Sequence, residues 1–298
     1  MPPAVDQGSA FITAMASLCK RFSVVGAGKM AEAMVSGLMR GSLQPAVATH
    51  IFDPNRHRVE LYQQQWPGIV GHESAAACVE GSDLVLLSVK PQHMPSVLES
   101  IRESVSNDAL IVSIAAGCPI SQFSNGLATD NIVRSMPNTP AMVGQGMTVW
   151  TATSECSEDQ RAQARTLLSS MGDEAYVDQE EYLDMATAIV GSGPAYTFLF
   201  MEAMIDTGVH MGFPRDVAEK LVTKTVEGSV AYLRQSDKHV AALRNDITSP
   251  GGTTAAAIYR SEHGGFRTTV SDTVWAAYRR SLELGGKDSN VGPGRSKS

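Results

Sequence analysis

Three short apolar runs in the first part of the chain show no alternation of apolar and polar residues. They are Phe22–Val25, Asp83–Lys90 and Ala109–Ile114, and helical patterns such as Met94–Ser104 separate them. A run of this length that ends at glycine or proline is typical of a strand buried on both faces. Because such strands alternate with helices, the pattern predicts an α/β domain with a doubly wound, mainly parallel sheet.

The pattern changes along the chain from strands to helices. Two further strand patterns lie in Ile132–Pro140 and Gly146–Trp150, and from about Glu158 helical spacing dominates. Apolar residues occur on more than one face of the later helices, which predicts a helix-bundle dimer. We expect a helix that starts with Ser192 as its cap and Pro194 in its first turn and that ends at His210. The other expected helices are Glu158–Met171, Glu180–Val190, Asp216–Leu233 and Gly265–Leu284.

A turn with three small residues, Gly26, Gly28 and Ala31, joins the first strand pattern to a helix pattern. Gly26 permits a tight turn, Gly28 lets a pyrophosphate approach the backbone, and Ala31 lets the helix pack closely on the strand. The N–H groups of the first helical turn then face the phosphates. Asp53 ends the next strand pattern, near the ~20-residue offset of a ribose-binding carboxylate. The sequence therefore predicts a Rossmann-type dinucleotide site.

Ligands of parallel sheets bind at the carboxyl ends of the strands. Ala115 and Ala116 are small enough to leave room for a flat ring. Lys90 is either a dinucleotide contact or a surface lysine beside a strand end. Asn138 could reach the nicotinamide end, although a turn residue between prolines is the commoner role. The strand ends that we expect to contact a dinucleotide are Gly26–Met30, Asp53, Ser88–Pro91 and Ile114–Gly117.

A loop rich in glycine and hydroxyl side chains leads into an alanine-rich helix within residues 246–262. Free backbone N–H groups at a helix start form an anion site. Hydroxyls at Thr248, Ser249, Thr253 and Thr254 add hydrogen-bonding groups to it. A second phosphate and a small carboxylate both fit this pattern, and a simple helix cap on a glycine-rich linker is the alternative.

The composition narrows the classes of partner. The 298 residues are 43% hydrophobic, enough for two domains with a substantial core. The net charge of −7 and the lack of a basic block make nucleic acid a poor partner. No apolar run approaches the ~20 residues that span a bilayer. Four scattered cysteines without a C-x-x-C pair argue against a disulfide framework and a zinc site. We therefore expect a cytoplasmic protein without a metal, and an organellar location is less favoured because Lys20 and Arg21 are the only basic residues before the first strand.

Five motifs together resemble the pyrroline-5-carboxylate reductase family over about residues 22–284. The last two, in this order and domain position, are specific to that family. The resemblance implies reduction of Δ1-pyrroline-5-carboxylate to L-proline, the last step of proline synthesis, by NADPH or NADH. It also implies a homodimer through the C-terminal helices, often built into larger rings. The motifs are Gly26-Ala-Gly-Lys-Met30, Val89-Lys-Pro91, Met136-Pro-Asn-Thr-Pro140, Gly191-Ser-Gly-Pro-Ala-Tyr196 and Thr248-Ser-Pro-Gly-Gly-Thr-Thr254.

The expected organisation has four parts. A flexible tail over residues 1–20 precedes a dinucleotide-binding Rossmann domain over residues 21–157. An all-α substrate and dimerisation domain follows over residues 158–285. Residues 286–298 are expected to be a disordered tail.

The resemblance also implies roles for single residues. Gly251, Gly252, Thr253 and Thr254 would hold the substrate carboxylate. The Thr254 hydroxyl, the expected catalytic group, would orient the ring nitrogen rather than protonate it, because threonine is a very weak acid. Glu180 matches an acidic position near the substrate in relatives, although a solvated glutamate at a helix start fits as well. The residues expected to hold the dinucleotide are Val25, Gly26, Ala27, Gly28, Lys29, Met30, Asp53, Asn55, Ser88, Val89, Lys90, Pro91, Ile114, Ala115 and Ala116.

Asp53 departs from the family pattern. Many relatives have Ser or Asn followed by Arg after the second strand, which receives the 2′-phosphate of NADPH. A carboxylate accepts the 2′-hydroxyl of NADH but repels a 2′-phosphate. We therefore expect NADH to be used at least as well as NADPH, unless Arg56 or Arg58 restores NADPH binding.

Two other functions stay open at this point. Another Rossmann imine or β-hydroxyacid oxidoreductase would usually place a lysine or histidine base in the helical domain. Lys220 and Lys224 lie there, but neither belongs to a recognisable catalytic motif. A catalytically inactive dinucleotide sensor would keep the fold, although the intact Gly251–Thr254 loop argues against it.

Overall fold

The computed structural model describes residues 19–40, 47–127 and 129–294. Most of the tail expected over residues 1–20 therefore lies outside the described residues. The described residues divide by their contacts into two compact units. The first unit includes the residues up to Ser192 and from Ala277 onward, and the second comprises Gly193–Ala276.

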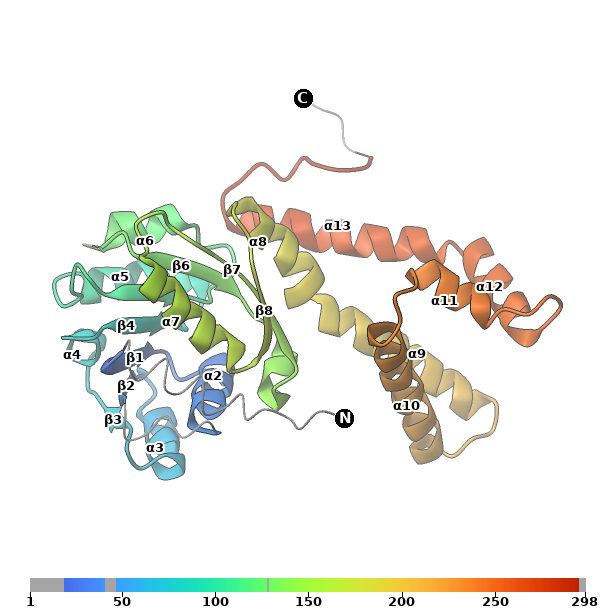
Figure 1. Ribbon diagram of the computed structural model, residues 1–298, viewed down its shortest axis with the longest axis horizontal. Coiled ribbons are helices and arrows are strands. Elements are labelled where there is room, and N and C mark those ends of the chain that lie inside the picture. The colour runs from blue at the N-terminus through green and yellow to red at the C-terminus, as the bar shows by residue number, and fades with distance from the viewer. Residues whose placement is uncertain (1–18, 41–46, 128, 295–298) are drawn as a thin grey trace. The chain divides into compact units, whose positions relative to one another are not determined.

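The first unit is built on an eight-stranded sheet with the strand order β3-β2-β1-β4-β5-β6-β7-β8 (Figure 1). All neighbouring strands are parallel except β6 and β7, so the mainly parallel, doubly wound sheet is confirmed. The strand order reverses between β1 and β4, which is where sheets of this type bind ligands. The strands are β1 (Arg21–Val25), β2 (Ala48–Phe52), β3 (Val70–Gly71), β4 (Leu84–Leu87), β5 (Leu110–Ser113), β6 (Ile132–Met136), β7 (Gly146–Ala152) and β8 (Gly172–Tyr176).

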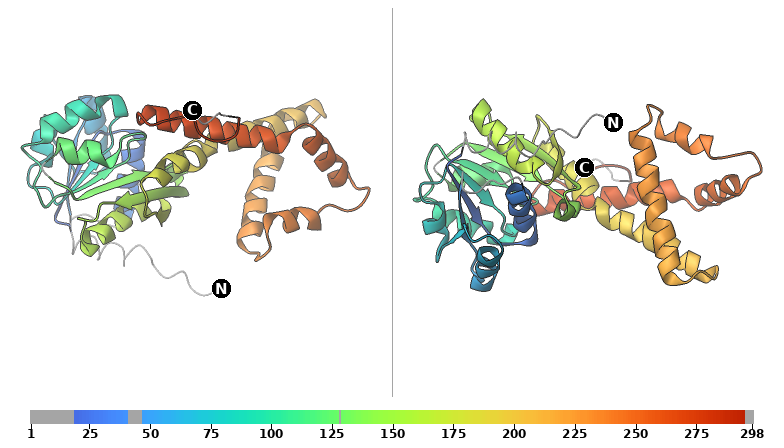
Figure 2. Two further views of the ribbon diagram at one scale, coloured as in Figure 1. Left: turned by 90° about the horizontal axis from the view of Figure 1, so that it is seen from above. Right: turned by 60° about the horizontal axis from the view of Figure 1, so that its bottom comes forward.

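Helices cover both faces of the sheet (Figure 2). Each face has its own apolar core. Met34, Tyr62 and Leu167 bring α2, α3 and α7 into one core, and Leu98 and Phe123 bring α5 and α6 into the other. This burial on both faces explains the absence of alternation in the strands. The elements are α2 (Lys29–Arg40), α3 (Arg56–Gln65), α4 (Ala75–Val79), α5 (Met94–Ile101), α6 (Ile120–Gly126), α7 (Glu158–Ser169) and the 3-10 turns η1 (Pro91–His93) and η2 (Thr139–Val143).

The first unit extends past the boundary that we expected at residue 157. Helix α7 shares a core with α2, and β8 pairs with β7 at the edge of the sheet. The sequence did not reveal β8 because this edge strand carries Asp173 and Glu174 and has no apolar run. It also missed β3, α4 and α6, whose two, five and seven residues are too short to show a period.

The chain leaves the first unit through a helical stretch that contains a π-turn. Helix α8 (Glu181–Ala186) continues into the π-turn Thr187–Gly191 and then into α9 (Gly193–His210). Ser192 has helical angles, φ −88° and ψ −20°, and its N–H donates to the Thr187 carbonyl at 2.9 Å. The predicted cap at Ser192 is therefore wrong. Pro194 has no N–H and cannot continue a regular helical ladder, which agrees with a wider turn at this place.

The second unit contains helices with little apolar core. Phe198 and Leu199 of α9 expose 64% and 66% of their surface. In Gly193–Ala276, all of which the structure describes, the buried apolar residues are Ala218, Val222 and Leu243. The remaining helices are α10 (Arg215–Arg234), α11 (Val240–Asp246), α12 (Thr253–His263) and α13 (Phe266–Leu284), of which the sequence missed α11. Helix α13 begins in the second unit and ends in the first.

The helical stretch Glu181–His210 is more apolar than the sequence led us to expect. Its most apolar window has a mean hydropathy of 1.3, so by length and composition alone it could cross a membrane. Only 6% of that window is buried within this chain. A helix that is apolar on most sides and exposed in a single chain needs an apolar partner outside that chain.

The structure describes residues 286–294, for which we expected disorder, and shows contacts of these residues within the first unit. The Arg279 guanidinium donates to the carbonyls of Val291 and Pro293, both at 2.9 Å. Lys287 donates to the carboxylate of Asp184 at 2.7 Å. Asp184 lies far from the tail in sequence, and the Arg279 contacts are to backbone carbonyls. The polar composition of the tail therefore gave no sign of either contact.

Candidate active site

The strand ends that we expected to bind a dinucleotide lie at one edge of the sheet. Val25 is opposite Phe52 on β2 and Leu87 on β4, and Leu87 is opposite Ser113 on β5. Because these strands are parallel, the residues that follow them emerge at the same edge. The structure thus brings together the segments after β1, β2, β4 and β5.

Glycine is required at the turn after β1. Gly26 has a φ of +100°, and a Cβ atom there would lie 2.5 Å from the Ser88 carbonyl oxygen. The Gly26 N–H donates to the Phe52 carbonyl at 2.8 Å, and the Ser88 N–H donates to that of Val25 at 2.9 Å. A Cβ atom on Gly28 would meet nothing within 4 Å, which leaves open space at the start of α2.

Asp53 holds the glycine turn. Its Oδ2 accepts the Ala27 N–H and its Oδ1 accepts the Asn55 N–H, both at 2.8 Å, and the side chain is 10% exposed. Asn55 in turn caps α3, because its Oδ1 accepts the His57 N–H at 3.2 Å. The sequence predicted that both residues lie at this edge. It did not predict that Asp53 holds the glycine turn or that Asn55 caps α3. Each carboxylate oxygen has a second lone pair, so Asp53 can still accept a ribose hydroxyl.

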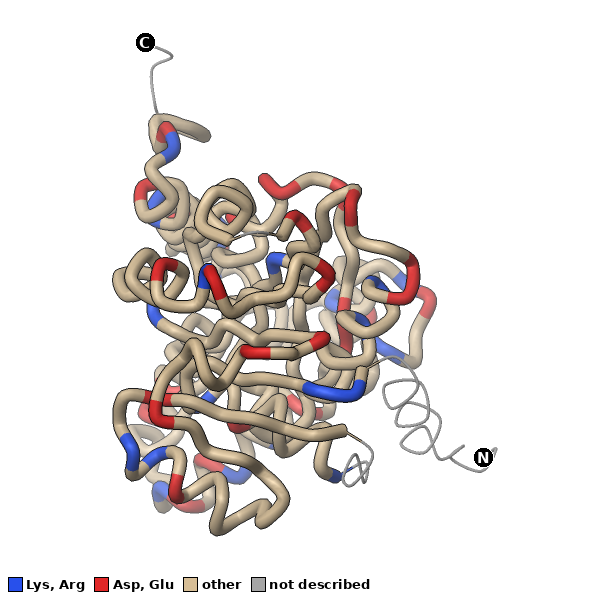
Figure 3. Tube along the Cα trace, turned by 90° about the vertical axis from the view of Figure 1, so that its left-hand side faces the viewer, with Lys and Arg blue, Asp and Glu red and all other residues tan. Residues whose placement is uncertain are grey.

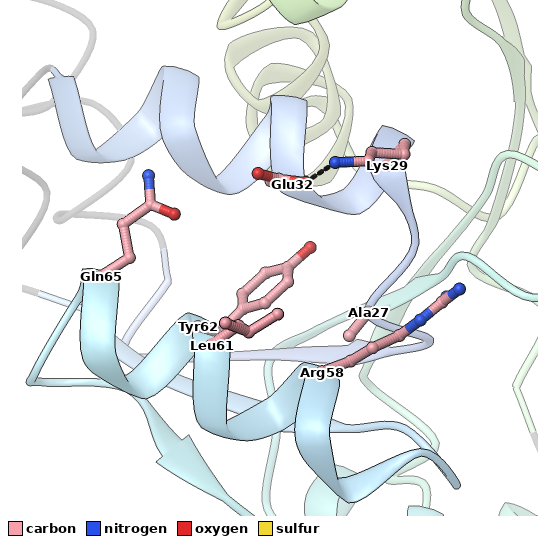
Figure 4. A pocket seen from close by; sticks show the side chains of 7 residues that line it. All are labelled: Ala27, Lys29, Glu32, Arg58, Leu61, Tyr62 and Gln65. Carbon is pink, nitrogen blue, oxygen red and sulfur yellow. Dashed lines mark hydrogen bonds and ion pairs between the residues drawn. The ribbon is translucent and has the colours of Figure 1, made fainter.

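A cavity of about 230 Å³ lies beside the glycine turn, between α2 and α3 (Figure 4). Lys29 and Arg58 are its cations, and Lys29 pairs with Glu32 at 3.2 Å. The Tyr62 hydroxyl donates to the Gly28 carbonyl at 3.2 Å. Burial raises the pKa of Tyr62, so this hydroxyl stays a neutral donor. The cavity is lined by Ala27, Lys29, Glu32, Arg58, Leu61, Tyr62 and Gln65.

The strand ends Ser88–Pro91 and Ile114–Ala116 differ in exposure. Lys90 is exposed and precedes the short turn η1, so it lies at the expected edge without a buried partner. Ala115 is buried, and its N–H donates to the Ser113 hydroxyl at 3.2 Å. Both strand ends are thus held by hydrogen bonds of their first residues, and they differ in the exposure of Lys90 and Ala115.

Asn138 is a turn residue in this structure. Its Oδ1 accepts the Met147 N–H at 2.9 Å, and its carbonyl accepts the Ala141 N–H at 3.1 Å. Of the two interpretations of Asn138, the turn residue agrees with these contacts.

The predicted substrate loop opens α12 in the second unit. Gly251 has a φ of +72°, and the Gly252 N–H donates to the Ser249 carbonyl at 3.0 Å. In the described part of the chain no side chain caps this helix at Gly252, so its first N–H groups remain available to an anion. Thr253 is exposed and Thr254 is half-buried at the same helix start.

Glu180 is not the solvated glutamate that we considered as an alternative. Its Oε1 accepts from the Arg134 guanidinium at 2.7 Å and from the Ile120 N–H at 2.9 Å. Its side chain is 26% exposed, and that of Arg134 is 3% exposed. The structure thus gives Glu180 protein partners of its own in the first unit.

Arg134 also reaches Asp184, which is 1% exposed, with a distance of 3.0 Å from Nη2 to Oδ1. Lys287 and the Ser281 hydroxyl donate to the same carboxylate at 2.7 and 3.2 Å. Burial alone would raise the pKa of Asp184, but the Lys287 hydrogen bond and the Arg134 charge outweigh it and hold that pKa below its usual value. We call Arg134, Glu180, Asp184 and Lys287 the charge cluster. The sequence reasoning missed it, although one arginine within an apolar strand pattern signals a buried cation that needs acidic partners.

Comparisons with known proteins agree with this arrangement. Residues 180–284 match the family model for pyrroline-5-carboxylate reductase dimerisation, and residues 21–117 match that for coenzyme F420-dependent NADP oxidoreductases. The pyrroline-5-carboxylate reductase of Synechocystis sp. is 37% identical over 267 residues, which cover 90% of this chain and 99% of that protein. The chain belongs to the pyrroline-5-carboxylate reductase family.

Further members of the pyrroline-5-carboxylate reductase family give the same result. The Pseudomonas aeruginosa enzyme is 39% identical over 266 residues, which cover 89% of this chain and 96% of that protein. The structure of the Coxiella burnetii reductase has a TM-score of 0.81 at 30% identity and covers 90% of this chain and 98% of its own. The Plasmodium falciparum reductase, solved with NADP bound, has a TM-score of 0.80 at 30% identity with the same coverage. The likeness thus extends over both units.

Proposed function

We propose that this chain reduces Δ1-pyrroline-5-carboxylate to L-proline with a hydride from a nicotinamide dinucleotide. The observation that carries the proposal is family membership over nearly the whole chain, which includes both the Gly26–Met30 turn and the Gly251–Thr254 loop. A hydroxyacid dehydrogenase is less well supported. Lys224, a candidate base, is 76% exposed and pairs with Glu227 at 3.0 Å, so it is not the buried, unpaired lysine that a general base requires.

The strand-end residues suit a dinucleotide. The open space at Gly28 admits a pyrophosphate, and the start of α2 presents N–H groups toward it. Asp53 has lone pairs for the ribose, and the small residues Ala115 and Ala116 follow β5, where a nicotinamide ring would lie. When bound, the nicotinamide ring would supply the hydride, and this protein would hold and orient it.

The substrate needs an anion site and an orienting group. The N–H groups of Gly251–Thr254 would bind the substrate carboxylate at the start of α12. The hydride adds to the imine carbon and a proton adds to the ring nitrogen, so the C=N bond becomes the C–N bond of proline. The Thr254 hydroxyl would hydrogen-bond and orient the ring nitrogen, while the proton comes with the substrate or from water.

Thr254→Val tests the orienting role because it keeps the shape of the side chain and removes the hydroxyl. A hydrogen bond to a charged group contributes about 1.5–3 kcal/mol, so we expect kcat/KM for pyrroline-5-carboxylate to fall about 10- to 100-fold. The rate of NAD(P)H oxidation measures it. Thr254→Ser keeps a hydroxyl and is the matched control, expected to stay near wild type. A fully active valine variant would contradict the role given to Thr254.

The charges around Asp53 favour NADH as a cofactor. Arg56 is 3.2 Å from Glu73 and 3.8 Å from Glu60, so its charge is already paired. Arg58 is 4.0 Å from Asp53 itself. Neither arginine is therefore a free cation for a 2′-phosphate. The carboxylates of Asp53, Glu60 and Glu73 outnumber the two guanidiniums. We therefore propose that NADH is used at least as well as NADPH.

Asp53→Asn tests this preference, because the amide oxygen keeps one acceptor of the turn while the negative charge is lost. We expect the ratio of kcat/KM for NADPH to that for NADH to rise about tenfold, as the loss of one close charge at moderate screening predicts. Steady-state kinetics with both cofactors measures the ratio. Glu99→Gln, which removes an exposed carboxylate on α5, is the control and should leave the ratio unchanged. A strong NADPH preference in the unmutated enzyme would refute the proposal.

The exposed apolar surface of the second unit suits a homodimer. An apolar groove lies between α9 and α13, where Phe200 and Phe266 have ring centroids 6.5 Å apart. Such a groove, together with the exposed Phe198 and Leu199, is typical of a protein interface. A second copy of the chain would cover these helices and would account for the apolar stretch Glu181–His210.

A further inference from the structure

The charge cluster contains a buried ion pair, Arg134 and Asp184, while Glu180 and Lys287 are 26% and 32% exposed. Acidic and basic positions are mixed along the chain trace (Figure 3), and among the described residues Arg134 and Asp184 are the only Lys, Arg, Asp or Glu residues that are buried. Burying ions is unfavourable, and apolar residues often stabilise a core equally well. A buried ion pair therefore indicates a geometric role, since each ion accepts only a narrow set of partner positions.

The cluster joins three segments that are far apart in sequence. Arg134 lies on β6, Glu180 and Asp184 lie at the start of α8, and Lys287 lies in the tail after α13. Lys287 contacts Asp184, both carboxylates contact Arg134, and the distances are between 2.7 and 3.0 Å. The tail is thus linked to the sheet through a continuous chain of ion pairs.

The segment Ile114–Ile120, which follows β5, is supported by the start of α8 and by the end of α13. Glu180 accepts the Ile120 N–H at 2.9 Å, at the start of α6. Gly117, with a φ of +71°, lies against the end of α13, because a Cβ atom there would be 3.1 Å from the Leu284 Cβ. The C-terminal end of α13 and the start of α8 therefore support this segment from two places.

The beginning of the segment is also fixed by β6. The Ala115 N–H donates to the Ser113 hydroxyl at 3.2 Å, and the Ser135 hydroxyl donates to the Ser113 carbonyl at 3.0 Å. Ser135 is the neighbour of Arg134, and both serines are buried. A shift of Arg134 would thus also shift Ser135, and through the Ser113 carbonyl it would shift Ala115.

We propose that the charge cluster positions the segment Ile114–Gly117 for the nicotinamide half of the dinucleotide, and that Lys287 is a positioning residue of the enzyme. The inference rests on the proposed function, in which Ile114–Ala116 contact the dinucleotide. Lys287 fixes Asp184, and Asp184 with Glu180 fixes Arg134. Glu180 in turn fixes the start of α6 next to the segment. Lys287 acts through these groups, and none of its contacts is to a residue expected to hold the dinucleotide.

Lys287→Met removes the outermost charge and keeps an unbranched side chain. Binding is measured with NADH and with ADP-ribose, which lacks nicotinamide, or with NADPH and 2′-phospho-ADP-ribose. Coupling through packed contacts changes binding by about 2- to 30-fold, so we expect the Kd of the dinucleotide to rise about fivefold. The Kd of the truncated ligand, which needs only the glycine turn and Asp53, should change by less than about twofold. Lys287→Arg should restore wild-type binding.

Arg280→Met is the matched control, because it removes an exposed ion pair with Glu283 at the end of α13, close to Lys287 in the sequence. This variant should bind the dinucleotide and the truncated ligand with the Kd values of the wild type. If Lys287→Met does not fold, Glu180→Gln, which keeps an acceptor for Ile120, should show the same selective loss. Equal weakening of both ligands, or no change, would overturn the inference. A wild-type protein that binds dinucleotide but does not turn over pyrroline-5-carboxylate would instead overturn the proposed function alone.

Discussion

Leu199→Asp is expected to convert the proposed dimer into a monomer. Leu199 of α9 is 66% exposed in the single chain and lines the apolar groove between α9 and α13. In a twofold dimer the substitution occurs twice, and each buried leucine contributes about 1.5–3 kcal/mol. The dimer Kd should therefore rise at least about a hundredfold, and the burial of a carboxylate adds to the loss. Sedimentation equilibrium over a range of protein concentrations measures it.

The control for this substitution is an apolar residue outside the second unit. Val70 on the edge strand β3 is 46% exposed, and Val70→Asp should leave the dimer intact. A Leu199→Asp protein that still dimerises with wild-type affinity would exclude this face of α9 from the interface.

Arg134→Met is expected to lower the free energy of unfolding by about 3–5 kcal/mol, as removal of one partner from a buried ion pair usually does. The substitution fills the space of the arginine stem but leaves Glu180 and Asp184 without their shared cation. Among the residues that the structure describes, Asp184, which is 1% exposed, then has only Lys287 and Ser281 as partners. Chemical denaturation followed by far-UV circular dichroism measures the change.

Arg280→Met gives the comparison for an exposed pair, because Arg280 and Glu283 are 65% and 46% exposed. Exposed pairs contribute about 0–1 kcal/mol, so this variant should be close to wild type. If Arg134→Met were as stable as Arg280→Met, the charge cluster would have no structural importance.

The sequence predicted the parts of the fold that local patterns determine. The run before Gly26, the small residues at Gly28 and Ala31, and the helix after them are all encoded within a short stretch, and β1, the turn and α2 follow it. The loop Gly251–Thr254 was placed at a helix start for the same reason, since Gly252 does precede α12. Residue type and spacing are sufficient where neighbours in sequence are also neighbours in space.

The sequence could not predict features that depend on distant partners. The N–H of Ala27 reaches the carboxylate of Asp53, which gives Asp53 a structural role besides the one expected from its offset. Lys287 lies in a polar tail, yet it binds a carboxylate 103 residues away in sequence. The edge strand β8 and the π-turn after α8 likewise depend on β7 and on the break at Pro194 rather than on an apolar period. These features appear only when the tertiary contacts are known.

The most direct test of the central claim is the stoichiometry of turnover by the purified protein. Pyrroline-5-carboxylate and NAD(P)H are supplied, dinucleotide oxidation is followed spectroscopically, and proline is quantified by amino-acid analysis. The proposed function predicts one proline formed for each dinucleotide oxidised, with no oxidation in the absence of the imine. A protein that binds the dinucleotide but shows no imine-dependent oxidation would contradict it and would favour the inactive sensor.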